Sequence, residues 1–277
     1  MKHTHISSRH DPFDLKLKEV WQYKDLILLF TRRSFQISYK QTVLGPLWLF
    51  LNPLMTALFQ MILFGRIAGL STDGVPQILF YLSGNALWSF FASRVSGNAA
   101  VFTANAGLFG KVYFPRLVIP VADVLSGLIR FGIQILLTLA VLVFYLFRGT
   151  VTPHWSLFPV LPLLTVLLGL IGMSTGIIIS SLTTKYRDLT VLVGFGLQLW
   201  MYVSPVVYPI STVSGSLRTL LLLNPVSAPL ELFRYILFGS GTVSLRSLVW
   251  SVFFTLAASF AGIIIFNKVE RTFIDTV

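Results

Sequence analysis

Long apolar runs are the feature of this sequence that most constrains its fold. Six of them lie near residues 44–65, 77–97, 120–147, 157–182, 189–209 and 246–266. Each approaches or exceeds the roughly 20 residues that an α-helix needs to cross a bilayer. Charged residues make up 11% of the chain, whereas soluble domains hold about 25%. We therefore predict an all-α polytopic membrane protein with six transmembrane helices.

The basic residues predict how these spans are oriented. An even number of spans puts both termini on one side of the membrane. With the termini in the cytoplasm, fifteen of the 21 Lys and Arg residues lie inside, five lie outside, and Arg130 falls within the third span. This bias is typical of cytoplasmic loops in membrane proteins. The net charge of +11 therefore reflects topology, and we expect no nucleic acid partner.

Residues 1–42 are predicted to form a cytoplasmic N-terminal segment, and residues 43–277 the membrane domain. The segment starts without an apolar core of the kind found in cleaved signal peptides. Within it, residues 15–37 predict an amphipathic helix with a basic polar face, which is typical of helices lying at lipid headgroups. The alternative is a soluble helix packed on a partner. The apolar stripe contains Leu17, Val20, Trp21, Ile27, Leu28 and Phe35.

Residues 204–246 contain two apolar pieces, 217–223 and 228–238, that are too short to cross a bilayer. They predict a pair of re-entrant helices between spans five and six, near the outer face. An amphipathic loop lying on the headgroups fits the residues equally well. Glu231 and Arg234 are spaced to pair on one helix face. Two further interpretations concern charges near the inner ends of spans: Asp123 with Arg130 as a shielded pair, and Arg94 extending to the membrane surface.

Enzyme motifs are missing from the sequence. There is no phosphate-binding G-x-x-x-x-G-K-[ST] loop, and the nearest match, Gly110-Lys111, is followed by Val112. We therefore expect no nucleotide hydrolysis, no metal site and no cofactor in this chain. A membrane-embedded glycan-processing enzyme would need an acid–base constellation, which the sequence lacks. An ion-coupled transporter would show repeats and ionisable groups at midplane, and neither is evident.

Two cytoplasmic turns carry bulky and charged residues together. Residues 105–120 read NAGLFGKVYFPRLVIP, and residues 183–190 read TTKYRDLT. In the first, a short helix over 105–111 would end before Pro115, because the residue preceding a proline is pushed out of helical geometry. Exposed turns of this kind predict docking surfaces. Since the chain has no nucleotide site, we expect an energy-supplying partner.

Aromatic residues make up 14% of the chain. Their flat faces could let sugar rings slide through a channel by stacking. The alternative is ordinary core packing together with the interfacial aromatic belt, and this is the stronger interpretation for any single residue. The candidate channel residues are Tyr81, Trp88, Phe91, Trp200, Tyr202 and Tyr208.

Five blocks of sequence, in this order, resemble the permease subunit of type-two ABC exporters for polysaccharides. They are YKQTVLGPLWLFLNPL (39–54), NAGLFGKVYFPRLVIP (105–120), KYRDLTVLV (185–193), SPVVYP (204–209) and NPVSAPLELFRYILFG (224–239). The resemblance implies a homodimer in the bacterial inner membrane with two ATPase subunits, which bind ATP and Mg. The implied cargo is a lipid-linked polysaccharide, most often O-antigen; capsule, teichoic acid or a small lipid or drug are alternatives.

The resemblance also assigns roles to residues. Residues 105–111 and 184–188 would be coupling helices seated in the ATPases, and residues 210–240 would hold the gate helices at the outer face. The outer gate candidates are Glu231, Arg234 and Tyr235. The candidate coupling residues are Asn105, Leu108, Phe109, Lys111, Tyr113, Lys185, Tyr186, Arg187 and Asp188.

Overall fold

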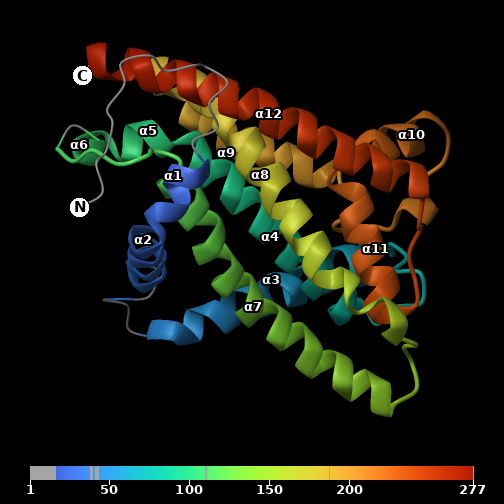
Figure 1. Ribbon diagram of the computed structural model, residues 1–277. Helices are drawn as coiled ribbons and strands as arrows, with labels where there is room; N and C mark the ends of the chain where they lie inside the picture. Colours follow the sequence, from blue (N-terminus) through green and yellow to red (C-terminus); the bar gives the residue numbers. More distant parts are fainter. Residues whose placement is uncertain (1–16, 38–39, 41–43, 110, 187, 277) are drawn as a thin grey trace.

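The computed structural model describes residues 17–37, 40, 44–109, 111–186 and 188–276, and within them every regular element is helical (Figure 1). The predicted all-α class is thereby confirmed. The short helical turns are η1 (Gly45–Leu47), the π-helical η2 (Met61–Ile67), η3 (Trp155–Leu157) and η4 (Ile210–Thr212). The α-helices are α1 (Leu17–Gln22), α2 (Lys24–Ile37), α3 (Trp48–Gln60), α4 (Gln77–Ala99), α5 (Val101–Ala104), α6 (Ala106–Phe109), α7 (Val118–Phe147), α8 (Val160–Lys185), α9 (Leu189–Tyr202), α10 (Gly215–Leu223), α11 (Ser227–Phe238) and α12 (Leu245–Thr276).

Helix α4 forms the centre of the protein and packs against α3, α7, α8 and α9. Small residues on α8 allow the closest of these approaches. A Cβ atom added at Gly172 would lie 2.9 Å from the carbonyl oxygen of Phe91, and one at Gly176 would lie 2.6 Å from that of Val95. Small residues of this kind let helix backbones pack tightly where lipid offers no hydrophobic driving force. The pair α4–α8 is therefore a closely packed unit, with α12 on the other side of α8.

Four helical segments are long and apolar enough to cross a membrane: 45–67, 118–147, 160–185 and 245–269. The number rises to five if the bent pair α10–α11 counts as one span. The chain is thus a multi-pass membrane protein. The two other predicted spans are helical as well. Helix α4 has 23 residues, enough for about 35 Å, but carries more polar side chains. Helix α9 has only 14 residues.

The predicted fifth span, 189–209, was too long. Helix α9 ends at Tyr202, and residues 203–209 are not helical. Pro205 explains this end, because proline disfavours helical geometry in the residue before it and has no N–H to donate. The non-helical SPVVYP stretch that follows is buried at Ser204, Pro205, Val206 and Val207. Irregular backbone at membrane depth is tolerated where protein surrounds it.

The N-terminal amphipathic helix is present, as α1 and α2, but its apolar residues face two ways. Val20 and Ile27 are buried against the protein, and the Thr31 hydroxyl donates to the carbonyl of Ala122 in α7. Trp21 and Leu28 of the predicted stripe are 74% and 61% exposed. The single apolar face that we predicted was therefore wrong. The helix packs on α7 and still presents apolar side chains outward, as a helix at the membrane surface would.

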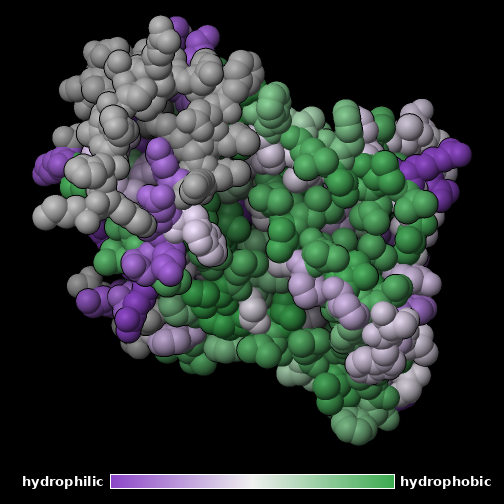
Figure 2. Space-filling view, in the orientation of Figure 1, coloured by the Kyte–Doolittle hydropathy of each residue, from purple (hydrophilic) through white to green (hydrophobic). Residues whose placement is uncertain are grey.

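A broad hydrophobic surface covers the helices that surround the core. Figure 2 shows this surface in the orientation of Figure 1. Most of the area where Figure 1 draws α7, α8 and α12 is green, the colour of hydrophobic residues. On α12 the exposed side chains include Val249, Phe253, Leu256 and Phe260. An apolar surface of this extent is unusual for a soluble protein and suits contact with acyl chains.

Candidate functional site

The first of the two turns predicted to be cytoplasmic forms two short helices, α5 and α6, at one end of the bundle (Figure 1). Asn105 lies between them, where its side-chain amide donates to the carbonyl of Val101 at 2.8 Å. Phe102 of α5 packs on Phe266 of α12, with ring centroids 4.8 Å apart. The turn is therefore held firmly on the ends of two long helices. A force applied to it would reach these helices directly.

Phe109, one of the candidate coupling residues, is partly buried. Its ring packs against Phe102 and Phe114, with centroids 6.0 and 5.8 Å away, and the guanidinium of Arg116 lies 5.1 Å from it. Leu108 is partly buried in the same cluster. The exposed tip of the turn is formed instead by Lys111, Val112 and Tyr113, and Tyr113 is 76% exposed. Phe109 supports this tip from within.

The second predicted docking turn lies close to the first. The Thr183 hydroxyl, near the end of α8, donates to the carbonyl of Ala99 at the end of α4. Beyond it, the Lys185 ammonium stacks over the ring of Tyr186, which is 51% exposed. Asp188 is exposed at the start of α9, and Arg187 lies outside the described residues. The two predicted docking turns thus share one end of the protein, joined through α4 and α8.

The predicted pair of short helices is present as α10 and α11, which meet at 91°. Such a bend fits a broken span or a re-entrant loop. Arg234 of α11 is almost fully buried. Its guanidinium donates to the carbonyls of Pro205, Val206 and Phe80, and lies 3.7 Å from the centroid of the Phe80 ring. This one side chain therefore joins α11 to the SPVVYP stretch and to α4.

Glu231 and Arg234 do face each other, with 3.7 Å between their closest oxygen and nitrogen atoms. The other carboxylate oxygen of Glu231 accepts a hydrogen bond from the Thr242 backbone N–H at 2.7 Å. Glycine 84 makes room for the arginine, since a Cβ atom there would lie 2.5 Å from its Nη2 atom. The pair is thus one part of a larger network whose main acceptors are backbone carbonyls.

Two residues that the sequence did not suggest also hold this region together. The His154 ring stacks on Tyr235 with centroids 4.2 Å apart, and its Nδ1 atom lies 3.0 Å from the Tyr235 carbonyl. Asp73 accepts hydrogen bonds from the Ser211 hydroxyl on both oxygens, at 2.6 and 2.7 Å. Both are in connecting loops, so only the folded chain brings them to α11 and η4. No local pattern in the sequence marks them.

The candidate channel aromatics separate into two groups. Tyr81, Trp88 and Phe91 are buried within the protomer, and Phe91 packs edge-on against Trp200 at 5.0 Å. These three side chains belong to the core in this conformation, and their role in a channel stays a prediction. The less buried group contains Trp200, Tyr202 and Tyr208; the Tyr208 hydroxyl donates to the Tyr202 carbonyl, and the Trp200 indole N–H donates to the Asn224 side chain.

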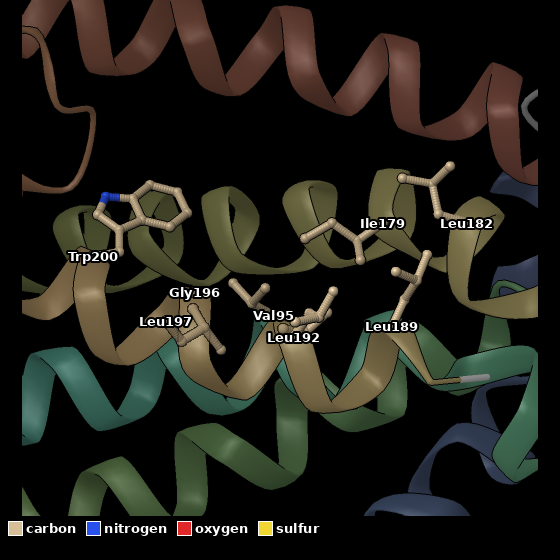
Figure 3. A pocket seen from close by; sticks show the side chains of 9 residues that line it. Val95, Ile179, Leu182, Leu189, Leu192, Gly196, Leu197 and Trp200 are labelled. Atoms are coloured by element: carbon tan, nitrogen blue, oxygen red, sulfur yellow. The ribbon is translucent and has the colours of Figure 1, made fainter. Parts of the chain in front are cut away.

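An apolar groove lies between α8 and α9, beside Trp200, with a volume of about 340 Å³ (Figure 3). Of the side chains of α9, only Leu197 is buried, so this short helix is mostly uncovered in the single chain. Among the described residues that line the groove, Trp200 is the only one with a polar group in its side chain. Its lining residues are Val95, Ile179, Leu182, Leu189, Leu192, Val193, Gly196, Leu197 and Trp200.

Arg94 does not reach the membrane surface, as the sequence suggested. It is 1% exposed and forms an ion pair of 2.8 Å with Asp123 of α7. Asp123 was expected to pair with Arg130, but Arg130 instead approaches the Ser126 hydroxyl, at 3.4 Å. Gly127 explains the outcome, because a Cβ atom there would lie 2.4 Å from Cζ of Arg94. A neighbouring helix thus supplies the partner that we sought on the same helix.

These features belong to a helical membrane permease, and the comparisons with known proteins agree. A family model described as ABC-2 type transporter matches residues 25–238, and the chain belongs to this family. Permeases of this family are membrane transport subunits that work with an ATPase partner.

Curated relatives share one name. The chain is 28% identical over 251 residues to an O-antigen export system permease protein RfbA of Klebsiella pneumoniae, covering 91% of this chain and 94% of the relative. It is 32% identical over 212 residues to a protein of the same name from Myxococcus xanthus, covering 76% of this chain and 79% of the relative.

Proposed function

We propose that this chain is the transmembrane subunit of an exporter that moves a lipid-linked polysaccharide, O-antigen in the first place, across the bacterial inner membrane. Its likeness over most of its length to proteins named O-antigen export permeases carries the proposal. The working unit is a homodimer with two ATPase subunits, which bind ATP and Mg. Both termini are cytoplasmic, and α3, α4, α7, α8, α9 and α12 are the six spans.

Three regions divide the work in this proposal. The exposed tip of the first turn and Tyr186 of the second receive the ATPases. Helices α10 and α11 form the outer gate, which Arg234 holds to the SPVVYP stretch. Trp200, Tyr202 and Tyr208, at the end of α9 and in the stretch that follows, supply aromatic faces for sugar rings. This assignment is supported by the exposure of the tip and by the 91° bend of the helix pair.

The test is complementation of a strain that lacks this chain but makes the glycan and the ATPase. Restored surface glycan, together with loss of the lipid-linked glycan that accumulates inside, supports the proposal. The matched control is a strain with an ATPase that cannot hydrolyse ATP, which should export nothing. Glycan at the surface without this chain, or without ATP hydrolysis, would contradict it.

A further inference from the structure

A strip of polar side chains follows the line where α4 meets α7, well inside the apolar part of both helices. The Ser89 hydroxyl and the Gln134 side chain are 2.9 Å apart, and one turn along α4 Ser93 lies 3.3 Å from Arg94. From Asp123 to Gln134 the strip follows α7 for about 16 Å. Its members are Ser89, Ser93, Arg94, Asp123, Arg130 and Gln134.

The outer edge of the strip is uncovered in the single chain. Ser89 and Ser93 are exposed on α4, most of whose side chains are buried, and Arg130 and Gln134 are half-buried. Polar side chains facing acyl chains at this depth are unfavourable. The strip must therefore face something polar.

The charges of the strip do not cancel. It contains two guanidinium groups and one carboxylate, and Arg94 takes the carboxylate of Asp123. In the part of the chain that the structure describes, no carboxylate lies within ion-pair distance of Arg130, and its buried Nε atom has no hydrogen-bond partner. A guanidinium in an apolar setting needs a counter-charge. One anion beside Arg130 would supply it.

We propose that the α4–α7 strip binds the phosphate group of a lipid. A guanidinium donates two parallel hydrogen bonds to phosphate. The Gln134 side-chain NH2 group, whose neighbouring oxygen accepts from the Ser89 hydroxyl, can donate to a remaining phosphate oxygen. The acyl or prenyl chains of such a lipid stay in the bilayer beside α7, whose exposed Ile129 and Leu136 flank Arg130 and Gln134. On the predicted orientation, the strip extends inward from the cytoplasmic half of the membrane.

Two lipids carry this chemistry: a bilayer phospholipid and the diphosphate-linked carrier of a glycan. Binding of the glycan carrier rests on the proposed function, because the strip would then hold the phosphate of the exported cargo. The first does not depend on export at all. Binding to the purified chain therefore tests the inference without the ATPase, so its failure would leave the export proposal standing.

The experiment measures lipid binding to the full chain in detergent by native mass spectrometry. The probes are dioleoylphosphatidylglycerol, dioleoylglycerol (the same tails without phosphate) and geranylgeranyl diphosphate. We expect both phosphate lipids to bind and dioleoylglycerol not to. Arg130→Gln should weaken binding of the phosphate lipids by about tenfold or more, because one charge-assisted contact is lost. Arg130→Lys should retain most of the binding, which separates charge loss from misfolding.

The matched control is Arg148→Gln, which makes the same change just beyond the other end of α7, where Arg148 is exposed over the Phe144 ring. It should leave all three lipids unaffected. If Arg130→Gln weakens only the prenyl diphosphate, the site serves the cargo; if only the phospholipid, it serves the bilayer. Equal binding by wild type and Arg130→Gln, or equal binding of dioleoylglycerol, overturns the inference. The inference is also overturned if Arg130→Gln dissociates the dimer in the same spectra and leaves lipid binding unchanged.

Discussion

The network around Arg234 leads to a quantitative prediction about the packing of α11. Arg234→Met keeps most of the side-chain volume but removes every donor. The carbonyls of Pro205, Val206 and Phe80 then lose their partner, at roughly 1–3 kcal/mol for each buried acceptor left unpaired. The carboxylate of Glu231, 1% exposed, also loses its counter-charge. Allowing for relaxation, we expect unfolding free energy to fall by roughly 3–5 kcal/mol.

Glu231→Gln should be much milder. The glutamine side chain still accepts the hydrogen bond from the Thr242 N–H, and Arg234 keeps its three carbonyls. The variant replaces a charge-assisted contact with a neutral one, so the free energy of unfolding should fall by about 1 kcal/mol. The double variant should be less destabilised than the sum of the two single variants, by about 1–2 kcal/mol, because it leaves no unpaired charge.

The assay is unfolding of the purified chain by SDS titration in mixed micelles, followed by tryptophan fluorescence. Arg218→Met is the matched control, since Arg218 lies exposed on α10 and its loss should cost under about 0.5 kcal/mol. If Glu231→Gln proves as destabilising as Arg234→Met, the ion pair dominates and the argument from backbone carbonyls is wrong. A wild-type stability for Arg234→Met would show that the arginine is not buried in the protein as described.

Three further predictions concern coupling, energy supply and topology. Tyr113→Ala should reduce co-purification of the ATPase several-fold and change the free energy of unfolding by under about 0.5 kcal/mol. Phe109→Ala should instead lower the free energy of unfolding by about 2 kcal/mol. The reverse pattern would make Phe109 the residue that contacts the ATPase. The purified chain should hydrolyse no ATP, because it has no phosphate-binding loop; activity that survives removal of contaminants would contradict this. The chain has no cysteine, so single cysteines can be labelled selectively. Ser156→Cys should react with an impermeant thiol reagent in intact cells, whereas Thr276→Cys should not. The opposite labelling would invert the topology.

Much of the secondary structure could be predicted because residues close together in the sequence determine it. Two short helices were expected at 217–223 and 228–238, and α10 and α11 occupy 215–223 and 227–238. Short apolar runs and the Asn224-Pro225 break set their ends. The end of α9 was missed because the apolar pattern continues past the helix into SPVVYP. There, the proline and the burial of the backbone decide the conformation, while hydrophobicity says only that the segment is apolar.

Partners across helices could not be predicted in the same way. Asp123 and Arg130 share one face of α7, so spacing alone suggested that they pair. The actual partner is Arg94, which reaches Asp123 because Gly127 leaves space for the guanidinium. The surroundings of Phe109 could not be predicted for a related reason: it is bulky and lies in a turn, yet three neighbouring groups pack around it. Burial is a property of the assembled bundle, and one sequence does not show which helices meet.

The packing also explains how two distant regions can act on each other. Helix α4 begins beside α11, where the Phe80 carbonyl accepts from Arg234, and ends at Ala99, whose carbonyl accepts from Thr183 beside the two predicted docking turns. Between these ends it packs on α8 through Gly172 and Gly176, with backbones too close to slide past one another freely. Closely packed interiors transmit strain because they are hard to compress. We therefore expect displacement of the tip at Tyr113 to reach the carbonyl partners of Arg234 as a rigid shift of α4 and α8, while the sparsely packed α9 can move separately.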